Sequence, residues 1–366
     1  MTSKNTVLSL AILFALFFSP FLVAATPQSG PLVSDNESIV GEGADAVSTI
    51  FHSFQSQEIV PITLKTNLSK LIKEKERGDY QGASITITNK LGETITKDIK
   101  VRPRGKSRRK LCSFPPIKIK FSKSDLEEDG LVRSFNTLKL VTHCYDSRPS
   151  EQNLLKEFLA YKIYNQLTDN SFRVQLVEIK YEDTEGKLRP MTKYGFIIEN
   201  NDELAERLGS KNIKRYNLPI EEMNELEYHT LHMFQYMIGN TDWKIDMIHN
   251  VKIMQLDENA TPVVVPYDFD FSGLVNAHYA RPHPDYTEIF RVRDRYYTAK
   301  QCPSEAVINQ TIELFEAKKE AILELCSNFE LLNKGERKDI TRFIKRFYDT
   351  IEKPSRVKGA FFKACK

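Results

Sequence analysis

The chain has 366 residues, 41% of them hydrophobic and 28% charged, and this composition excludes a disordered or fibrous protein. The length is sufficient for one large domain or two lobes with a sizeable core. The 52 basic and 49 acidic residues leave a formal net charge of +3, so the chain as a whole lacks the charge excess of a nucleic-acid binder or a membrane-surface protein. Nucleic acid is not an expected partner, and any function of the basic residues must be local.

The N-terminus has the pattern of a secretory signal peptide. Lys4 precedes an apolar run over residues 7–24, and small residues lead up to Ala25. An uncleaved membrane anchor is the alternative, but Ser19 and Pro20 interrupt the run. We therefore expect residues 1–25 to be removed, leaving an exported, periplasmic or extracellular protein without a stable membrane anchor.

Five cysteines lie in the exported part, and no two have the CxxC spacing of a metal site: Cys112, Cys144, Cys302, Cys326 and Cys365. In an oxidising compartment we expect disulfides instead. Cys112 and Cys144 lie at the ends of predicted neighbouring strands, so we expect them to pair. The other three leave one odd thiol, and the sequence does not say which.

Residues 26–57 are rich in small polar residues and indicate a linker or lead-in. Residues 58–200 then form a β-rich N-terminal lobe. Apolar and polar residues alternate there in predicted strands at 62–66, 83–87, 94–101, 115–121, 136–141, 173–181 and 194–199, with a polar helix candidate at 67–77 and an apolar-faced helix at 151–167.

Residues 201–366 are mainly helical in pattern, with predicted helices at 202–208, 220–238, 304–327 and 338–351. A short stretch between the second and third helices carries acidic loops. A β-rich lobe followed by a helical lobe with acidic loops is a kinase-like order of elements. The sequence therefore predicts an α+β, two-lobed protein-kinase-like fold with a β-rich N-lobe and a helical C-lobe.

Phosphoryl transfer requires cations on the phosphates, metal ligands and a carboxylate near the attacking group. Lys118 and Lys120 share one face of a strand and are candidates to contact phosphates, unless both line a solvated face. The basic loop at 102–110, with Arg104, can cover nucleotide phosphates, or it is a solvated, self-repelling loop. The chain has no Walker sequence.

Glu157 is the candidate partner carboxylate for such a lysine. It lies between Leu155 and Phe158 on the helix 151–167 and is expected at the edge of a buried face. A surface position is the alternative, and Glu151 is then the next candidate.

The stretch MIGNTDWKIDMIHN begins where Gly239 suits the end of a helix. Asp242 follows in a loop, where it can accept a proton from a hydroxyl or cap the next turn. Asn250 opens a strand and can offer its carbonyl oxygen to a hard cation. We expect His249 to make a structural hydrogen bond.

Two carboxylates, Asp268 and Asp270, follow the apolar strand 262–266. Burying them is costly unless they bind something positive. Mg²⁺ or Mn²⁺ is the expected ion, since Mg²⁺ prefers oxygen ligands together with substrate phosphates.

These motifs resemble the spore-coat protein H (CotH) kinase family and, more distantly, HipA-type and secretory-pathway kinases. The resemblance covers about residues 60 to 275, in the order RGKS, PPIKIKF, NLLKEFLAY, YGFIIEN, GNTDW, HN and PYDFD. It implies ATP as co-substrate. By this similarity Lys118 or Lys120 binds the nucleotide with Glu157 as its ion-pair partner, and Glu199 lies in the hinge that receives the base.

The resemblance also implies that Asp242 is the catalytic Asp and that Asn250 and Asp268 are metal ligands. One departure concerns spacing. Protein kinases place the Asn about five residues after the catalytic Asp. Asn250 is further than that from Asp242 in the sequence, and Asp246 is closer to Asn250 than Asp242 is. A short insertion after Trp243 would account for this.

We therefore expect an exported, metal-dependent atypical kinase of the CotH type that phosphorylates a protein hydroxyl. The alternatives are a pseudokinase-like binding or scaffold protein of the envelope, and nucleotidylation (AMPylation) by the same groups. A metal-dependent hydrolase or nuclease using Asp242, His249 and Asp268 is a further alternative, but the sequence lacks the His clusters it would want.

Overall fold

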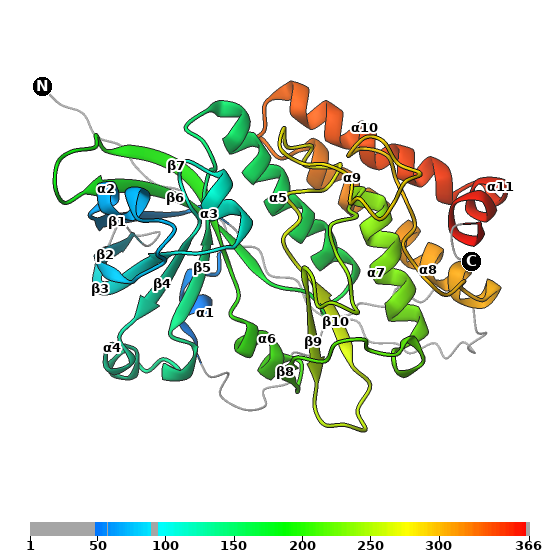
Figure 1. The fold of residues 1–366 in the computed structure, drawn as a ribbon, viewed down its shortest axis with the longest axis horizontal. Helices are drawn as coiled ribbons and strands as arrows, with labels where there is room; N and C mark the ends of the chain where they lie inside the picture. The colour runs from blue at the N-terminus through cyan, green and yellow to red at the C-terminus, as the bar shows by residue number, and fades with distance from the viewer. Residues whose placement is uncertain (1–47, 57, 89–93, 364–366) are drawn as a thin grey trace, which may run out of the picture. The chain divides into compact units, whose positions relative to one another are not determined.

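Seven strands in the first part of the chain pair into a closed barrel (Figure 1). The computed structural model describes residues 48–56, 58–88 and 94–363, so the predicted signal peptide lies outside the described residues. The strands follow one another around the barrel in the order β1, β2, β3, β4, β5, β7, β6. Their bounds are β1 Val60–Thr66, β2 Gln81–Thr88, β3 Thr94–Pro103, β4 Ile117–Phe121, β5 Thr137–Val141, β6 Val174–Asp183 and β7 Met191–Ile198.

The predicted two-lobed kinase-like fold with a helical C-lobe is wrong, because the sheet closes on itself. β1 pairs in parallel with β6, and Val60 lies opposite Val177. Alternation along a sequence identifies the two faces of a strand but not which sheet edges meet. The C-terminal part is also not purely helical: it contains a second sheet of β8 Lys211–Ile213, β9 Val251–Gln255 and β10 Val263–Pro266.

The barrel encloses its own apolar core. Side chains at alternate strand positions, such as Leu64, Val101, Ile119 and Leu138, have no exposed surface. On β4 this leaves the lysines on the opposite, outward face, as the two-residue period requires. The inside of the barrel is therefore filled with apolar side chains, and the charged side chains of its strands lie on its outer face.

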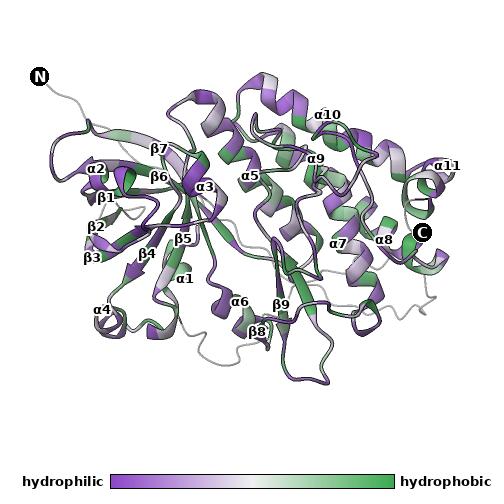
Figure 2. Cartoon of the chain, viewed as in Figure 1, coloured by the Kyte–Doolittle hydropathy of each residue, from purple (hydrophilic) through white to green (hydrophobic). Residues whose placement is uncertain are grey.

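A second core joins the long helices to the three-stranded sheet. The long helices are α5 Arg148–Leu167, α7 Glu225–Ile238, α8 Glu305–Ala317, α9 Lys319–Ser327 and α10 Lys334–Ile351. The shorter helices are α1 Ile50–Phe54, α2 Leu68–Lys73, α3 Ser107–Leu111, α4 Lys123–Glu128, α6 Asn201–Arg207 and α11 Pro354–Val357, followed by a π-helix at Lys358–Phe362. Figure 2 shows the hydrophobic colouring of β9, which lies in this core.

Helix α7 ends where the sequence predicted. Gly239 adopts φ +64°, and its backbone N–H donates to carbonyl oxygens of the last turn. This left-handed conformation suits glycine, which has no Cβ to clash. The chain then turns directly into the loop that carries Asp242.

Cys112 and Cys144 form a disulfide, the pair expected from the sequence. It joins the end of α3 to the segment after β5. Among the described residues Cys326 is the free cysteine, and it is buried. Within the same residues no helix is long and apolar enough to cross a membrane.

Candidate functional site

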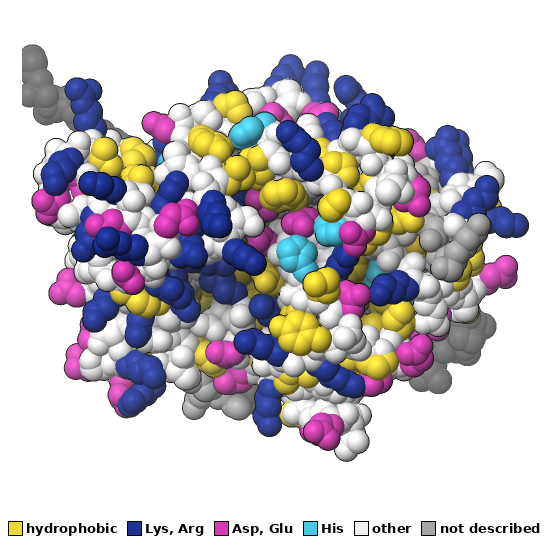
Figure 3. Space-filling view, in the orientation of Figure 1, with side chains coloured by type: hydrophobic (Ala, Val, Ile, Leu, Met, Phe, Trp, Pro, Cys, Tyr) yellow, Lys and Arg dark blue, Asp and Glu magenta, His cyan; other side chains and the backbone are white. Residues whose placement is uncertain are grey.

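Basic side chains form a row across three neighbouring barrel strands. Arg102 of β3 lies opposite Lys118 of β4, and Lys118 lies opposite Lys139 of β5. Lys120 is further along β4, and both Lys120 and Arg102 lie over the ring of Tyr80, at 5.6 and 5.0 Å from its centre. Figure 3 shows Lys and Arg side chains gathered around a hollow on this face.

Lys139 lies where the basic row meets the second sheet. Its ammonium group donates to Asn201 and lies 5.1 and 5.9 Å from the ring centres of Phe172 and Tyr267. Burial lowers the pKa of Lys139 well below its ordinary value, and the charges of nearby Arg104, Lys252 and Lys118 lower it further. Such crowding of like charges favours a bound multivalent anion.

Among the residues that the structure describes, no carboxylate forms an ion pair with this basic cluster. The cluster consists of Arg102, Arg104, Lys118, Lys139 and Lys252, and none of the ion pairs among the described residues includes a member of it. Burial lowers the pKa of Arg104, while the charge of Asp268 opposes that lowering. Asp268 is therefore an acidic group close to Arg104, and the charge of Asp202 acts in the same direction on Lys139.

Asp268 and Asn250 lie at the same end of the β9–β10 hairpin. The backbone N–H of Tyr267 donates to the carbonyl of Asn250 at 3.0 Å, and that of Asp268 donates to the hydroxyl of Tyr161 at 2.8 Å. Both Asp268 and Asn250 have left-handed backbones, with φ +66° and +53°. Non-glycine residues in this region are strained, and such strain concentrates at functional sites.

Asp242 is held by two neighbours on its own loop. Its Oδ1 contacts His249 Nε2 at 2.9 Å, and Asn250 Nδ2 donates to its Oδ2 at 3.1 Å and to its backbone carbonyl at 2.7 Å. The hydrogen bond from His249 to Asp242 raises the pKa of His249. Asp242 is thus fixed in orientation, and a quarter of its side chain is exposed.

The loop also accounts for the unusual spacing of Asp242 and Asn250. Lys244 and His249 exchange two backbone hydrogen bonds, of 3.0 and 2.9 Å, so residues 245–248 form a closed turn between them. The turn brings Asn250 back beside Asp242 despite the longer intervening segment.

Behind these loops one arginine bridges two buried carboxylates. Arg108 of α3 contacts Glu157 of α5 at 3.0 Å and Asp270 at 3.3 Å, and the Tyr279 hydroxyl donates to Asp270 at 3.0 Å. Burial raises the pKa of Glu157 to about 8, with Arg108 acting against the rise, and raises the pKa of Asp270 to about 6. One guanidinium cannot balance two carboxylates, so the group tends to retain a proton.

The candidates from the sequence therefore have different surroundings. Glu157 pairs with Arg108, where the resemblance implied Lys118 or Lys120. Glu199 is buried and bound through both oxygens to Arg207, at 2.9 and 3.0 Å. Its carboxylate also accepts the N–H of Arg173 at 3.1 Å, so both oxygens of Glu199 are already engaged in holding these arginines.

Four of the remaining candidates lie in one region of the structure. Arg104, Lys118, Asn250 and Asp268 lie around the basic cluster or the hairpin end that faces it. Glu151 accepts the N–H of Tyr194 at 3.1 Å.

Lys139, Lys252 and Tyr279 were not among the candidates from the sequence, and Arg108 was expected only as part of the basic loop at 102–110. Lys139 alternates with buried Leu138 and Leu140, a pattern that marks its face but not its neighbours. The partners of Arg108 come from helix α5 and the loop after β10. No local sequence signal could have identified them.

At this end of the hairpin a divalent ion would need the phosphate oxygens of a bound substrate in addition to the protein side chains. The described part of the chain contains no cluster of three or more His, Cys, Asp or Glu side chains that would hold a metal alone. Mg²⁺, however, is usually held by one or two carboxylates plus substrate phosphates. Asp268 and the amide oxygen of Asn250 meet that smaller requirement, whereas Oδ2 of Asp270 is engaged by Arg108 and Tyr279.

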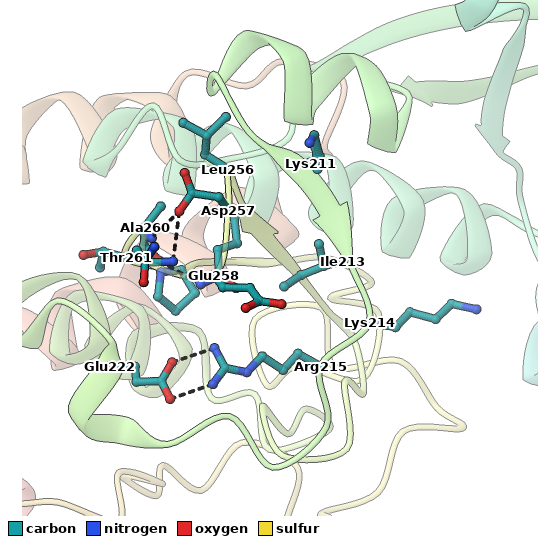
Figure 4. Close-up of a pocket in the computed structure, with 13 residues that line it drawn as sticks. Lys211, Ile213, Lys214, Arg215, Glu222, Leu256, Asp257, Glu258, Ala260 and Thr261 are labelled. Atoms are coloured by element: carbon teal, nitrogen blue, oxygen red, sulfur yellow. Dashed lines mark hydrogen bonds and ion pairs between the residues drawn. The ribbon is translucent and has the colours of Figure 1, made fainter.

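A large hollow lies elsewhere, at the far end of the β9–β10 hairpin (Figure 4). It measures about 860 Å³ and is lined by Lys211, residues 213–215, Glu222 and residues 255–262. Its polar groups bond among themselves: Arg215 contacts Glu222, and Asp257 accepts two backbone N–H groups. None of the candidate residues lines it, so we place the site at the basic cluster.

Comparison of the sequence with protein-family models and with curated proteins found no match.

Proposed function

We propose that the protein transfers a phosphoryl group from a nucleoside triphosphate, ATP in the first instance, to a hydroxyl group of a protein. The observation that carries the proposal is the row of basic side chains on neighbouring strands, which has no ion pair with a carboxylate among the described residues, with Asp268 close to Arg104. Clusters of Lys and Arg without carboxylate partners are costly without an anion, and a triphosphate supplies several negative charges.

The basic residues bind and orient the triphosphate. Lys118 and Lys139 lie opposite each other on neighbouring strands, so both can contact one phosphate chain. Arg104 adds a planar donor beside Asp268. Lys120, one strand pleat away, extends the positive face.

Asp268 and Asn250 are the residues that would hold Mg²⁺ or Mn²⁺, completed by phosphate oxygens. When bound, the ion neutralises charge on the phosphates during transfer. Asp270 holds Arg108 and Tyr279, and through them the loop that carries Asp268.

Asp242 accepts the proton of the acceptor hydroxyl. The hydroxyl oxygen bonds to the terminal phosphorus, the bond to the bridging oxygen breaks, and the diphosphate leaves with that electron pair. Asn250 and His249 fix the orientation of the Asp242 carboxylate for this step.

The motifs GNTDW, HN and PYDFD support the proposal through their resemblance to the CotH kinase family. The fold implied by that resemblance is not the one found, so the proposal rests on the side chains of the site. An exported location follows from the N-terminal sequence and is part of the proposal.

Calorimetric titration of ATP into the purified protein, with Mg²⁺ or Mn²⁺, tests binding first. We expect metal-dependent binding that an Asp268→Ala variant loses. Transfer is then followed with γ-labelled and α-labelled ATP: label transferred only from the γ position supports phosphorylation, and transfer from the α position replaces it with nucleotidylation. Binding without any transfer reduces the protein to a nucleotide-binding module, and no binding with either metal rejects the proposal.

A further inference from the structure

A second hollow, of about 390 Å³, lies beside Asp242. The residues that directly follow Asp242 form one wall, and helix α7, the segment before it and residues 285–300 form the others. Most of the lining is apolar or aromatic, with Trp243, Tyr228 and Leu218 all nearly buried. A concave apolar surface of this kind is typical of a binding site.

The charged residues of this pocket neutralise one another. Lys244 pairs with Asp285, and Lys300 pairs with Asp246 at 3.0 Å. These four are all the Lys, Arg, Asp and Glu side chains in the lining. The pocket therefore has no net charge and selects an uncharged occupant.

Two polar groups of the lining lack a partner among the described residues. The indole Nε1 of Trp243 and the hydroxyl of Thr298 are buried without a hydrogen bond. Buried polar groups are nearly always satisfied, and each unsatisfied one costs free energy. Neither atom has surface open to the hollow, so an occupant with carbonyl oxygens, such as a peptide backbone, would have to shift these two side chains to bond them.

We propose that this pocket binds an apolar side chain of the acceptor polypeptide, close in sequence to the hydroxyl that is phosphorylated. The inference rests on the proposed function, since it names a specificity feature of the acceptor. Its observations are independent of the phosphate site: the apolar lining, the paired charges and the place of the hollow next to Asp242 in the chain.

The chain offers a direct readout, because Trp243 is its only tryptophan and lines the pocket. Blocked peptides with one serine and one neighbouring Phe, Leu, Asp or Lys are titrated into the protein without nucleotide, and Trp243 fluorescence is followed. We expect the Phe and Leu peptides to bind roughly tenfold or more tightly than the Asp and Lys peptides, because the charged side chains would lose hydration without a partner. Equal binding of all four, or no change in emission, overturns the inference.

Two methionines give a matched pair of variants. Met223→Arg places a charge in the pocket lining and should abolish the preference for Phe and Leu. Met247→Arg, at a position 63% exposed and outside the lining, should keep it. If Met223→Arg retains the preference, the peptides bind elsewhere and the inference fails.

Calorimetry with ATP in the absence of peptide separates this inference from the proposed function. Peptide preference without ATP binding rejects the proposed function and, with it, the description of the bound peptide as an acceptor. ATP binding and transfer without peptide preference reject only the pocket.

Discussion

Asn250 donates a hydrogen bond to the backbone carbonyl of Asp242 at 2.7 Å, across a loop that residues 245–248 close. The same side-chain nitrogen contacts Oδ2 of Asp242 at 3.1 Å. One amide therefore positions the proposed base, while its oxygen has no hydrogen bond among the described residues and can be offered to a cation. The site depends on this loop geometry more than on the spacing of the two residues in the sequence.

Removing this amide should impair transfer more than folding. In an Asn250→Ala variant Asp242 loses both contacts, and we expect the transfer rate to fall about 100-fold, within the range of a misplaced general base. The rate is measured with γ-labelled ATP and the fold by circular dichroism. Asn259→Ala, in the turn at the far end of the hairpin, is the control and should keep the full rate. An unchanged rate in Asn250→Ala would contradict the role of Asp242.

His249 should titrate above its ordinary value of 6.5, because the hydrogen bond to Asp242 favours its protonated form. Asp242→Asn removes that charge and should lower the pKa of His249, as NMR titration of the ring would show. A raised folded-state pKa means that the stabilising pair is fully present below about pH 6.5 and is lost as pH rises through the folded value. The effect is small, since His249 is half exposed.

Removing one cation from the basic cluster should have opposite effects on stability and binding. Lys139→Gln relieves repulsion from Arg104, Lys252 and Lys118, so we expect a higher thermal midpoint without ligand. Loss of a charged phosphate contact should weaken ATP binding roughly tenfold or more. Differential scanning calorimetry and titration measure the two effects, with exposed Lys65→Gln of β1 as the control. Lower stability together with unchanged ATP affinity would show that Lys139 has only a structural role.

The buried carboxylates should make stability depend on pH. The folded-state pKa of Glu157 is raised by burial to about 8 from an ordinary 4.5. The folded protein therefore binds more protons than the unfolded chain between these values, and stability should fall as pH rises through that window. Glu157→Gln, neutral at every pH, should flatten the decline. Denaturant unfolding at pH values across the window tests this, and a variant curve parallel to that of the unmodified protein would contradict it.

The disulfide should support the site as well as the fold, because α3 carries Arg108 and ends at Cys112. Replacing Cys112 and Cys144 with serine removes a link across 32 positions and should cost about 3 to 4 kcal/mol of unfolding free energy. Freed α3 would also loosen the contact between Arg108 and Glu157. We therefore expect weaker ATP binding in the double variant at temperatures where it remains folded. ATP affinity equal to that of the unmodified protein would show that α3 does not support the ATP site.

The sequence identified elements whose signals are local. Alternation predicted the strand that carries Lys118 and Lys120, and a glycine at position 239 predicted the end of α7. Two cysteines at the ends of neighbouring strands predicted their disulfide. The cost of burying acids after an apolar strand drew attention to Asp268 and Asp270. Apart from the disulfide, which joins two predicted strands 32 positions apart, each of these inferences needs only the residue and its immediate chain neighbours.

Tertiary structure decided which of these pieces meet. The parallel contact of β1 with β6 closes the barrel and overturns the expected fold, because strand pairing depends on segments more than a hundred residues apart. For the same reason, the ion-pair partner of Glu157 is Arg108 rather than a lysine. Lys139 likewise lies close to Lys118 and Lys252. Local sequence sets the direction in which a side chain points from its strand or helix. Only the packing of distant segments sets what that side chain meets.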